Sequence, residues 1–127
     1  MKEIMAIIRM DKINETKRAL SEAGFPSITC RRVNGRGKKK VDYELIETLI
    51  DGKQVASANV LESISEAHRL ISKRMLIIVV KDEEVSKVVD TIIEVNQTGN
   101  MGDGKIFVST INEAIRVRTN ETGNAAI

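Results

Sequence analysis

A run of three glycines and a lysine between Thr98 and Lys105 is the part of the sequence best suited to binding a ligand. Successive backbone N–H groups in a glycine-rich turn form a concave surface for anion oxygens, and a lysine adds a point charge. Further along, Arg116 and Arg118 place two guanidinium groups on one side of an extended segment. A glycine-rich turn is often only a turn, but together the two features favour a polyphosphate ligand.

The glycine run also comes close to the motif of P-loop nucleotide hydrolases, because four residues separate Gly99 from Gly104 and Lys105. Two observations argue against that assignment. Ile106 stands where a P-loop has the serine or threonine that ligates Mg²⁺. The order of elements is also reversed, because a P-loop follows a strand and precedes a helix, whereas here a predicted helix precedes the turn and a strand follows it.

Length and composition indicate a single domain over residues 1–127. Aromatic residues make up only 2% of the chain and the net charge is +2, which argues against a nucleic-acid-binding protein. Cys30 is the only cysteine and cannot form an internal disulfide, which fits a reducing compartment. The sequence has no apolar run of about 18 residues and no signal peptide. We therefore expect a cytoplasmic protein.

Hydrophobic periodicity divides the chain into strands and helices. Helical spacing predicts one helix over Lys12–Ala23, with Asp11 as its N-cap, and a second that begins at Asp82 and ends near Asn96. Short apolar or alternating runs predict strands over Glu3–Met10, Ser27–Asn34, Met75–Val80 and Lys105–Ser109.

Beyond these elements, Thr110–Glu113 matches a capping box for a very short helix, and Ala114–Thr119 is predicted as a final strand. The order gives two βαβ-like halves, which predicts a ferredoxin-like α+β sandwich with two helices on one face of the sheet. Apolar residues occur on both sides of the first and third strands. The opposite sheet face therefore needs cover, which we expect from other subunits.

The long insert between the second and third strands, about residues 36–72, is unusual for a compact domain. Two amphipathic stretches, Tyr43–Ile50 and Asn59–Ile71, follow a basic start. One interpretation is a helical hairpin packed on its own subunit. The other, which the length favours, is an arm that docks onto a partner protein.

Two stretches carry a family resemblance. Met1–Arg9 resembles the opening strand, and Gln97–Phe107 followed by Ile115–Thr119 resembles the closing signature, of the PII nitrogen-regulatory signal transducers. The resemblance covers residues 1–37 and 73–127. The insert lies where that family has its T-loop.

Details of the sequence narrow the resemblance further. The insert is longer than in the common glutamine-synthetase-associated members. This length, with Gly24–Thr29 and Val95–Thr98, resembles the archaeal nitrogenase-regulating subgroup, in particular its second paralogue.

The resemblance implies a homotrimer, or a hetero-oligomer with a PII paralogue, that binds ATP or ADP between subunits and senses 2-oxoglutarate at the T-loop base. Mg²⁺ would enter with ATP. By position, the implied ATP or ADP ligands are Ile7, Thr29, Gly35, Gly37, Lys38, Ile77, Val79, Thr98, Gly102, Asp103, Gly104, Lys105, Arg116 and Arg118. The residues implied for 2-oxoglutarate are Gly37, Lys39, Lys40 and Lys73.

The T-loop departs from the family pattern in two places. Lys39 stands where the family has a glutamine that helps to hold Mg²⁺ and 2-oxoglutarate, and a cation cannot ligate a metal. Tyr43 is the only tyrosine and lies outside the usual context of the family's modified tyrosine, so we do not expect its uridylylation.

The leading hypothesis is a non-catalytic transducer whose T-loop inhibits a target, dinitrogenase in the first place. A PII-type regulator of an ammonium transporter or of glutamine synthetase is the alternative. A small nucleotide-hydrolysing enzyme is more distant, since Asp103 is its only candidate base near the turn. An RNA-binding domain would have only Phe107 for stacking. Cys30 and His68 make no zinc motif.

Overall fold

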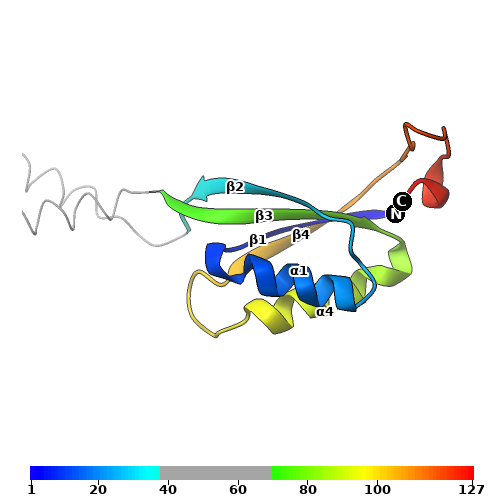
Figure 1. Ribbon diagram of the computed structural model, residues 1–127. Coiled ribbons are helices and arrows are strands. Elements are labelled where there is room, and N and C mark those ends of the chain that lie inside the picture. The colour runs from blue at the N-terminus through cyan, green and yellow to red at the C-terminus, as the bar shows by residue number, and fades with distance from the viewer. Residues whose placement is uncertain (38–69) are drawn as a thin grey trace, which may run out of the picture. The chain divides into compact units, whose positions relative to one another are not determined.

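A computed structural model describes residues 1–37 and 70–127 of the chain (Figure 1). The chain divides into two compact units, one formed by Met1–Val33 with Ser72–Ile127 and the other by Asn34–Ile71. No helix in the described ranges is long and apolar enough to cross a membrane. The main elements are β1 (Lys2–Arg9), α1 (Ile13–Glu22), β2 (Thr29–Gly35), β3 (Ile71–Val80), α4 (Val85–Asn96) and β4 (Gly104–Thr110), with short 3₁₀ turns at Met10–Lys12, Asp82–Glu84 and Gly123–Ala126.

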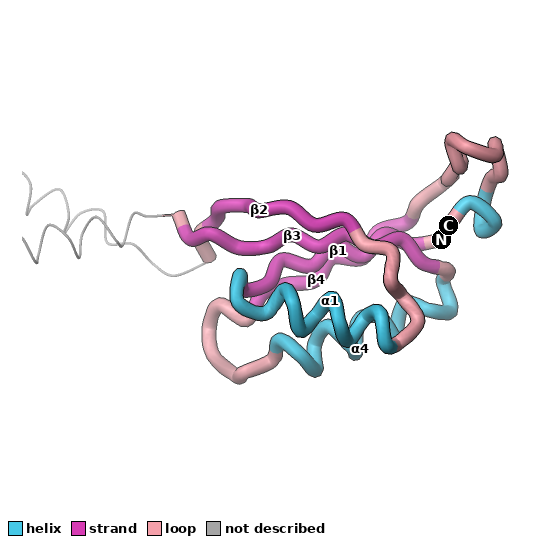
Figure 2. Tube along the Cα trace, viewed as in Figure 1, coloured by secondary structure: helices cyan, strands magenta, loops and turns pink. Residues whose placement is uncertain are grey.

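The strands form one sheet in the order β2-β3-β1-β4, and β1 pairs antiparallel with both β3 and β4. Figure 2 shows both helices on the same face of this sheet. This arrangement is the ferredoxin-like βαββαβ topology, so the α+β fold predicted for the single chain is confirmed.

Alternation along the strands puts one set of side chains into the core beneath the helices. Ile4, Ala6 and Ile8 of β1 are completely or almost completely buried, while the residues between them are half-buried. From the helices, the core receives Ile13, Leu20, Val88 and Ile92.

A buried polar pair fixes α1 against the C-terminal end of α4. The Asn96 side-chain amide donates to the Thr16 hydroxyl at 3.0 Å and to the carbonyl of Ile92 at 2.9 Å. Both Thr16 and Asn96 are buried, where a lost hydrogen bond is costly. The pair therefore holds the point from which the glycine-rich loop departs.

The sheet face away from the helices carries an apolar row. Met5 lies opposite both Ile77 and Phe107, and Phe107 is 50% exposed. Val79 is half-buried on the same face. This exposed apolar row is the reason to expect that other subunits cover this face of the sheet.

Both predicted helix caps are wrong in detail. Asp11 lies within the 3₁₀ turn that precedes α1, and no side chain caps that helix. Asp82 pairs with the N-terminal ammonium at 2.8 Å, which lowers the pKa of its carboxyl group. The carboxylate of Glu84 instead accepts the backbone N–H of Lys81 at 3.0 Å.

The predictions for the C-terminal segment are also wrong. No helix forms over Thr110–Glu113, because Thr110 still belongs to β4 and the Glu113 carboxylate accepts the N–H of Gly123 at 3.1 Å. Ala114–Thr119 is not a strand but one side of a small hairpin with a single bridge.

The third strand is longer than its predicted range. It starts at Ile71, whereas the sequence pattern extended a helix to that residue. Residues 59–69 of that predicted helix and Tyr43–Ile50 lie outside the described residues.

Candidate functional site

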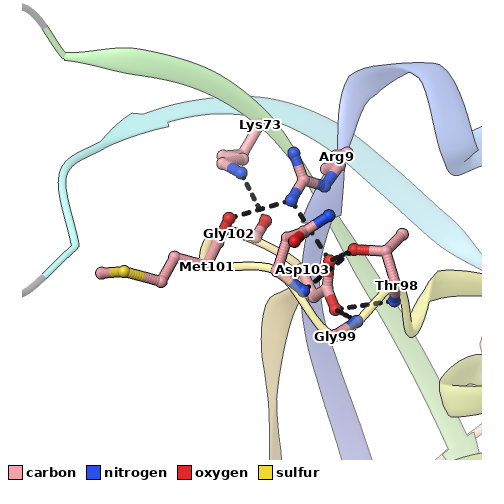
Figure 3. Close-up of polar contacts among 8 residues, drawn as sticks. Arg9, Lys73, Thr98, Gly99, Met101, Gly102 and Asp103 are labelled. Atoms are coloured by element: carbon pink, nitrogen blue, oxygen red, sulfur yellow. Dashed lines mark hydrogen bonds and ion pairs between the residues drawn. The ribbon is translucent and has the colours of Figure 1, made fainter.

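The loop between α4 and β4, residues 97–103, is folded around the carboxylate of Asp103. This carboxylate accepts the backbone N–H groups of Thr98 at 2.7 Å and Gly99 at 3.0 Å, and it also accepts the Thr98 hydroxyl (Figure 3). These bonds, led by the Thr98 hydroxyl, hold the pKa of Asp103 well below its usual range. Asp103 is thus an ionised structural acceptor and is poorly suited to act as a general base.

Two cations cover the other side of this loop. Arg9 donates to the carbonyl of Met101 at 2.9 Å and to the carboxylate of Asp103 at 3.2 Å, and Lys73 donates to the carbonyl of Gly102 at 2.8 Å (Figure 3). Arg9 and Lys73 are direct cross-strand partners on β1 and β3. Like charges in that position repel each other, so the carbonyls and the carboxylate of the loop stabilise the pair.

Sequence reasoning missed the role of Arg9. The available signal was its position at the end of β1, on the same face as Ile7, where antiparallel pairing brings it to Lys73.

The tip of the loop retains free hydrogen-bond donors. Within the part of the chain that the structure describes, the backbone N–H groups of Met101 and Gly102 have no acceptor. A side chain at Gly102 would come within 3.4 Å of the Arg9 guanidinium, so cationic groups lie close to these amides. Free amides beside cations form a site suited to an anion.

Gly104 allows the loop to pack directly against the backbone of β1. Its φ is +123°, and a Cβ atom there would lie 2.0 Å from the carbonyl oxygen of Ile7, so only glycine fits. The next residue, Lys105, is the direct cross-strand partner of Ile7. Ile7, Lys73 and the loop residues up to Lys105 therefore lie together at one end of the sheet.

Arg116 and Arg118 lie at the opposite end of the sheet. The seven extended residues of β4 separate the glycine loop from the segment that carries them, a span of roughly 20 Å, and Figure 1 shows that segment at the same end of the sheet as the N-terminus. Closeness in sequence thus does not make one site within a single chain, because the intervening residues are a strand.

The remaining predicted residues divide between the two ends. Thr29 begins β2, and Val79 lies near the end of β3, whose last residue shares the cross-strand partner Lys2 with the end of β4. Ile77 is in the middle of β3. Gly35 ends β2 and Gly37 is the last described residue at the start of the insert, while Lys38, Lys39 and Lys40 lie outside the described ranges.

The ferredoxin-like sheet with both helices on one face defines an α+β domain whose loop between α4 and β4 offers free backbone amides. Residues 1–121 match the family described as Nitrogen regulatory protein P-II, and the chain belongs to this family. P-II proteins are non-catalytic signal transducers, which confirms the prediction that the protein is not an enzyme.

Several archaeal proteins are similar to the chain over its whole length. It is 47% identical to a "Nitrogen fixation nifHD region GlnB-like protein 2" of Methanobacterium ivanovii, over 100% of this chain and 99% of that protein. It is 45% identical to the protein of the same description in Methanococcus maripaludis, over all of both chains. The predicted resemblance to the second archaeal paralogue is confirmed.

Proposed function

We propose that this P-II protein reports nitrogen and energy status by binding ATP or ADP together with 2-oxoglutarate, and that residues 36–72 transmit the result to a target. The observation that carries the proposal is the pair of free amides at Met101 and Gly102, with Arg9 and Lys73 beside them. A nucleotide phosphate satisfies these donors and supplies the negative charge that the cations favour.

The nucleotide site is completed by a second subunit. The glycine loop and the segment with Arg116 and Arg118 are at opposite ends of one chain, so both can contact one phosphate chain only when they come from different copies or paralogues. The half-buried apolar row of Met5, Ile77 and Phe107 supports the same assembly, because a trimer would cover it.

Lys73 is the described residue through which 2-oxoglutarate is proposed to act. Its ammonium donates to the carbonyl of Gly102, and a carboxylate of the ligand would form a stronger, charge-assisted bond with it. Gly37, Lys39 and Lys40 would supply the rest of the site. Since Lys39 cannot ligate a metal, Mg²⁺ is proposed to be held through the phosphates alone.

The proposed target is dinitrogenase, in keeping with the nifHD region that the descriptions of the relatives name. A regulator of an ammonium transporter or of glutamine synthetase is the second candidate. Deleting residues 41–71 should leave nucleotide binding intact and abolish inhibition of dinitrogenase. Inhibition that persists in this truncated protein would show that the arm is not the effector.

Isothermal titration calorimetry with ATP tests the ligand assignment. We expect Lys105→Ala or Arg118→Ala to weaken binding by about tenfold or more, because each removes a cation from the phosphate site. Lys17→Ala, on the exposed face of α1, is the matched control and should bind as the wild type does. Unchanged ATP affinity in Lys105→Ala would overturn the assignment. Native mass spectrometry with ATP, ADP and 2-oxoglutarate gives the stoichiometry.

A further inference from the structure

The segment after β4 folds into a closed hairpin that contains both arginines. The backbone N–H of Arg116 donates to the carbonyl of Glu121 at 2.9 Å, and the N–H of Asn120 donates to the carbonyl of Arg116 at 2.8 Å. Ile115 and Thr122 form the bridge beyond them. Asn120 has a φ of 60°, which makes the turn possible.

The hairpin also holds the Arg116 side chain by two contacts. Its guanidinium donates through Nη1 to the carboxylate of Glu121 at 2.9 Å and through Nη2 to the carbonyl of Ala125 at 3.0 Å. A guanidinium has five N–H donors, so three remain. The Arg116 side chain is 36% exposed, which leaves these donors accessible from solvent. Arg118, in the same turn, has no partner among the described residues.

We propose that Glu121 is a positioning residue for nucleotide binding: with the Ala125 carbonyl, it fixes the Arg116 guanidinium in the orientation that meets a phosphate. The inference rests on the proposed function, because it assumes that Arg116 contacts the nucleotide. Long side chains lose rotamer freedom when they bind a ligand. An arginine side chain that the free protein already holds in place loses less rotamer freedom on binding.

The opposite possibility is that Glu121 competes with phosphate for Arg116. The backbone argues against it, because Glu121 and Arg116 are paired residues of one closed hairpin, and separating them requires the hairpin to open. The contact also occupies only part of the guanidinium. A phosphate can therefore bind the remaining donors without displacing the carboxylate.

The Ala125 contact comes from a tail that extends past the matched family region. The match with the P-II family ends at residue 121, whereas the relatives from nifHD regions cover the chain to its last residue. The tail thus contributes one of the two acceptors that orient Arg116. We expect removal of residues 123–127 to weaken ATP binding by about two- to threefold, less than loss of the charged Glu121 contact.

The experiment is a double-mutant cycle measured by calorimetry with ATP. Glu121→Ala should weaken ATP binding by about three- to tenfold, the loss expected when an oriented side chain becomes free to rotate. In the Arg116→Ala background, Glu121→Ala should have no further effect, since Glu121 acts only through Arg116. Glu94→Ala, an exposed glutamate on α4, is the matched control and should leave the affinity unchanged.

Glu121→Gln separates positioning from competition, because glutamine keeps an oxygen acceptor for Nη1 but removes the charge. Positioning predicts an affinity between those of the wild type and Glu121→Ala. Tighter ATP binding in either Glu121 variant, no change in Glu121→Ala, or additive effects in the cycle would overturn the inference. The proposed function itself fails if the wild type does not bind ATP or if Arg116→Ala binds it normally, and the inference then falls with it.

Discussion

The glycine loop at one end of the sheet and the C-terminal hairpin at the other are both organised by a carboxylate, but in different ways. Asp103 accepts N–H and O–H groups of its own loop and so shapes the backbone. Glu121 accepts a guanidinium and so orients a side chain. One region is thus organised to offer backbone amides to an anion, and the other to offer a cation.

The two regions also differ in how tightly they pack. Gly104 brings the loop into direct contact with the β1 backbone, whereas nothing lies within 4 Å of the position that a side chain at Gly123 would take. We therefore expect the loop to be sensitive to added volume and the hairpin to be sensitive mainly to lost polar contacts.

The largest expected effect is that of Gly104→Ala. The added methyl group would lie 2.0 Å from the Ile7 carbonyl at a φ of +123°, so β1 and β4 must separate locally. We expect a loss of about 3 kcal/mol or more in the free energy of unfolding, measured by urea denaturation. Gly123→Ala is the matched control, with a φ of +66° in open space, and should cost only about 1 kcal/mol. Equal losses in the two variants would contradict the comparison.

The next effect concerns the Asp103 carboxylate. Asp103→Asn replaces one acceptor oxygen with an NH₂ group that faces the donors of Thr98, Gly99 or Arg9. We expect the loop to lose its fixed shape and ATP binding to weaken by about tenfold in calorimetry, because the free amides are no longer held together. Asp90→Asn, on the exposed face of α4, is the control. Normal ATP binding by Asp103→Asn would show that the carboxylate does not organise the site.

A smaller effect is expected from pH. The pKa of Asp103 is lowered in the folded state from a reference value of 3.8, so the folded protein binds fewer protons than the unfolded chain near that value. The stabilisation is therefore fully present above about pH 5 and decreases as the pH falls below about 4. Wild type should lose stability in acid more steeply than Asp103→Asn, as followed by urea denaturation at several pH values.

The pKa of Asp82 is lowered, like that of Asp103, in this case by its contact with the N-terminal ammonium. The comparison is therefore made in an Asp82→Asn background, where that contribution is absent. Parallel acid profiles for the two proteins in this background would contradict the role given to Asp103.

Much of the fold could be predicted because it depends on local patterns. The apolar run of β1 and the helical spacing of Val88 and Ile92 predict core elements that the structure confirms. The predictions are wrong where a hydrogen-bond or ion-pair partner that is distant in the sequence determines the local structure. The Glu113 carboxylate, assigned to a capping box, binds Gly123 instead, and Asp82 binds the N-terminal ammonium. Each carboxylate has a stronger partner than the local pattern can reveal.

The candidate site was predictable in its residue types but not in its geometry. Lys105 lies beside Ile7, because the two are cross-strand partners on β4 and β1. The separation of Arg116 from this loop depends on the length and direction of β4. The contacts of Arg9 with the loop depend on the antiparallel register that places Arg9 opposite Lys73. The spacing of residues in the sequence does not reveal that register.

The smallest expected effect returns to the hairpin, at Asn120. Its φ of 60° is tolerated by asparagine and glycine but disfavoured for other residues. Asn120→Gly should change the free energy of unfolding by less than about 0.5 kcal/mol, whereas Asn120→Ala should cost about 1 kcal/mol. Urea denaturation distinguishes them. Asn120 also has a positive φ, but it lacks the close contact that Gly104 makes with β1. A loss in Asn120→Ala as large as that in Gly104→Ala would therefore mean that packing against β1 is not what makes Gly104 sensitive to substitution.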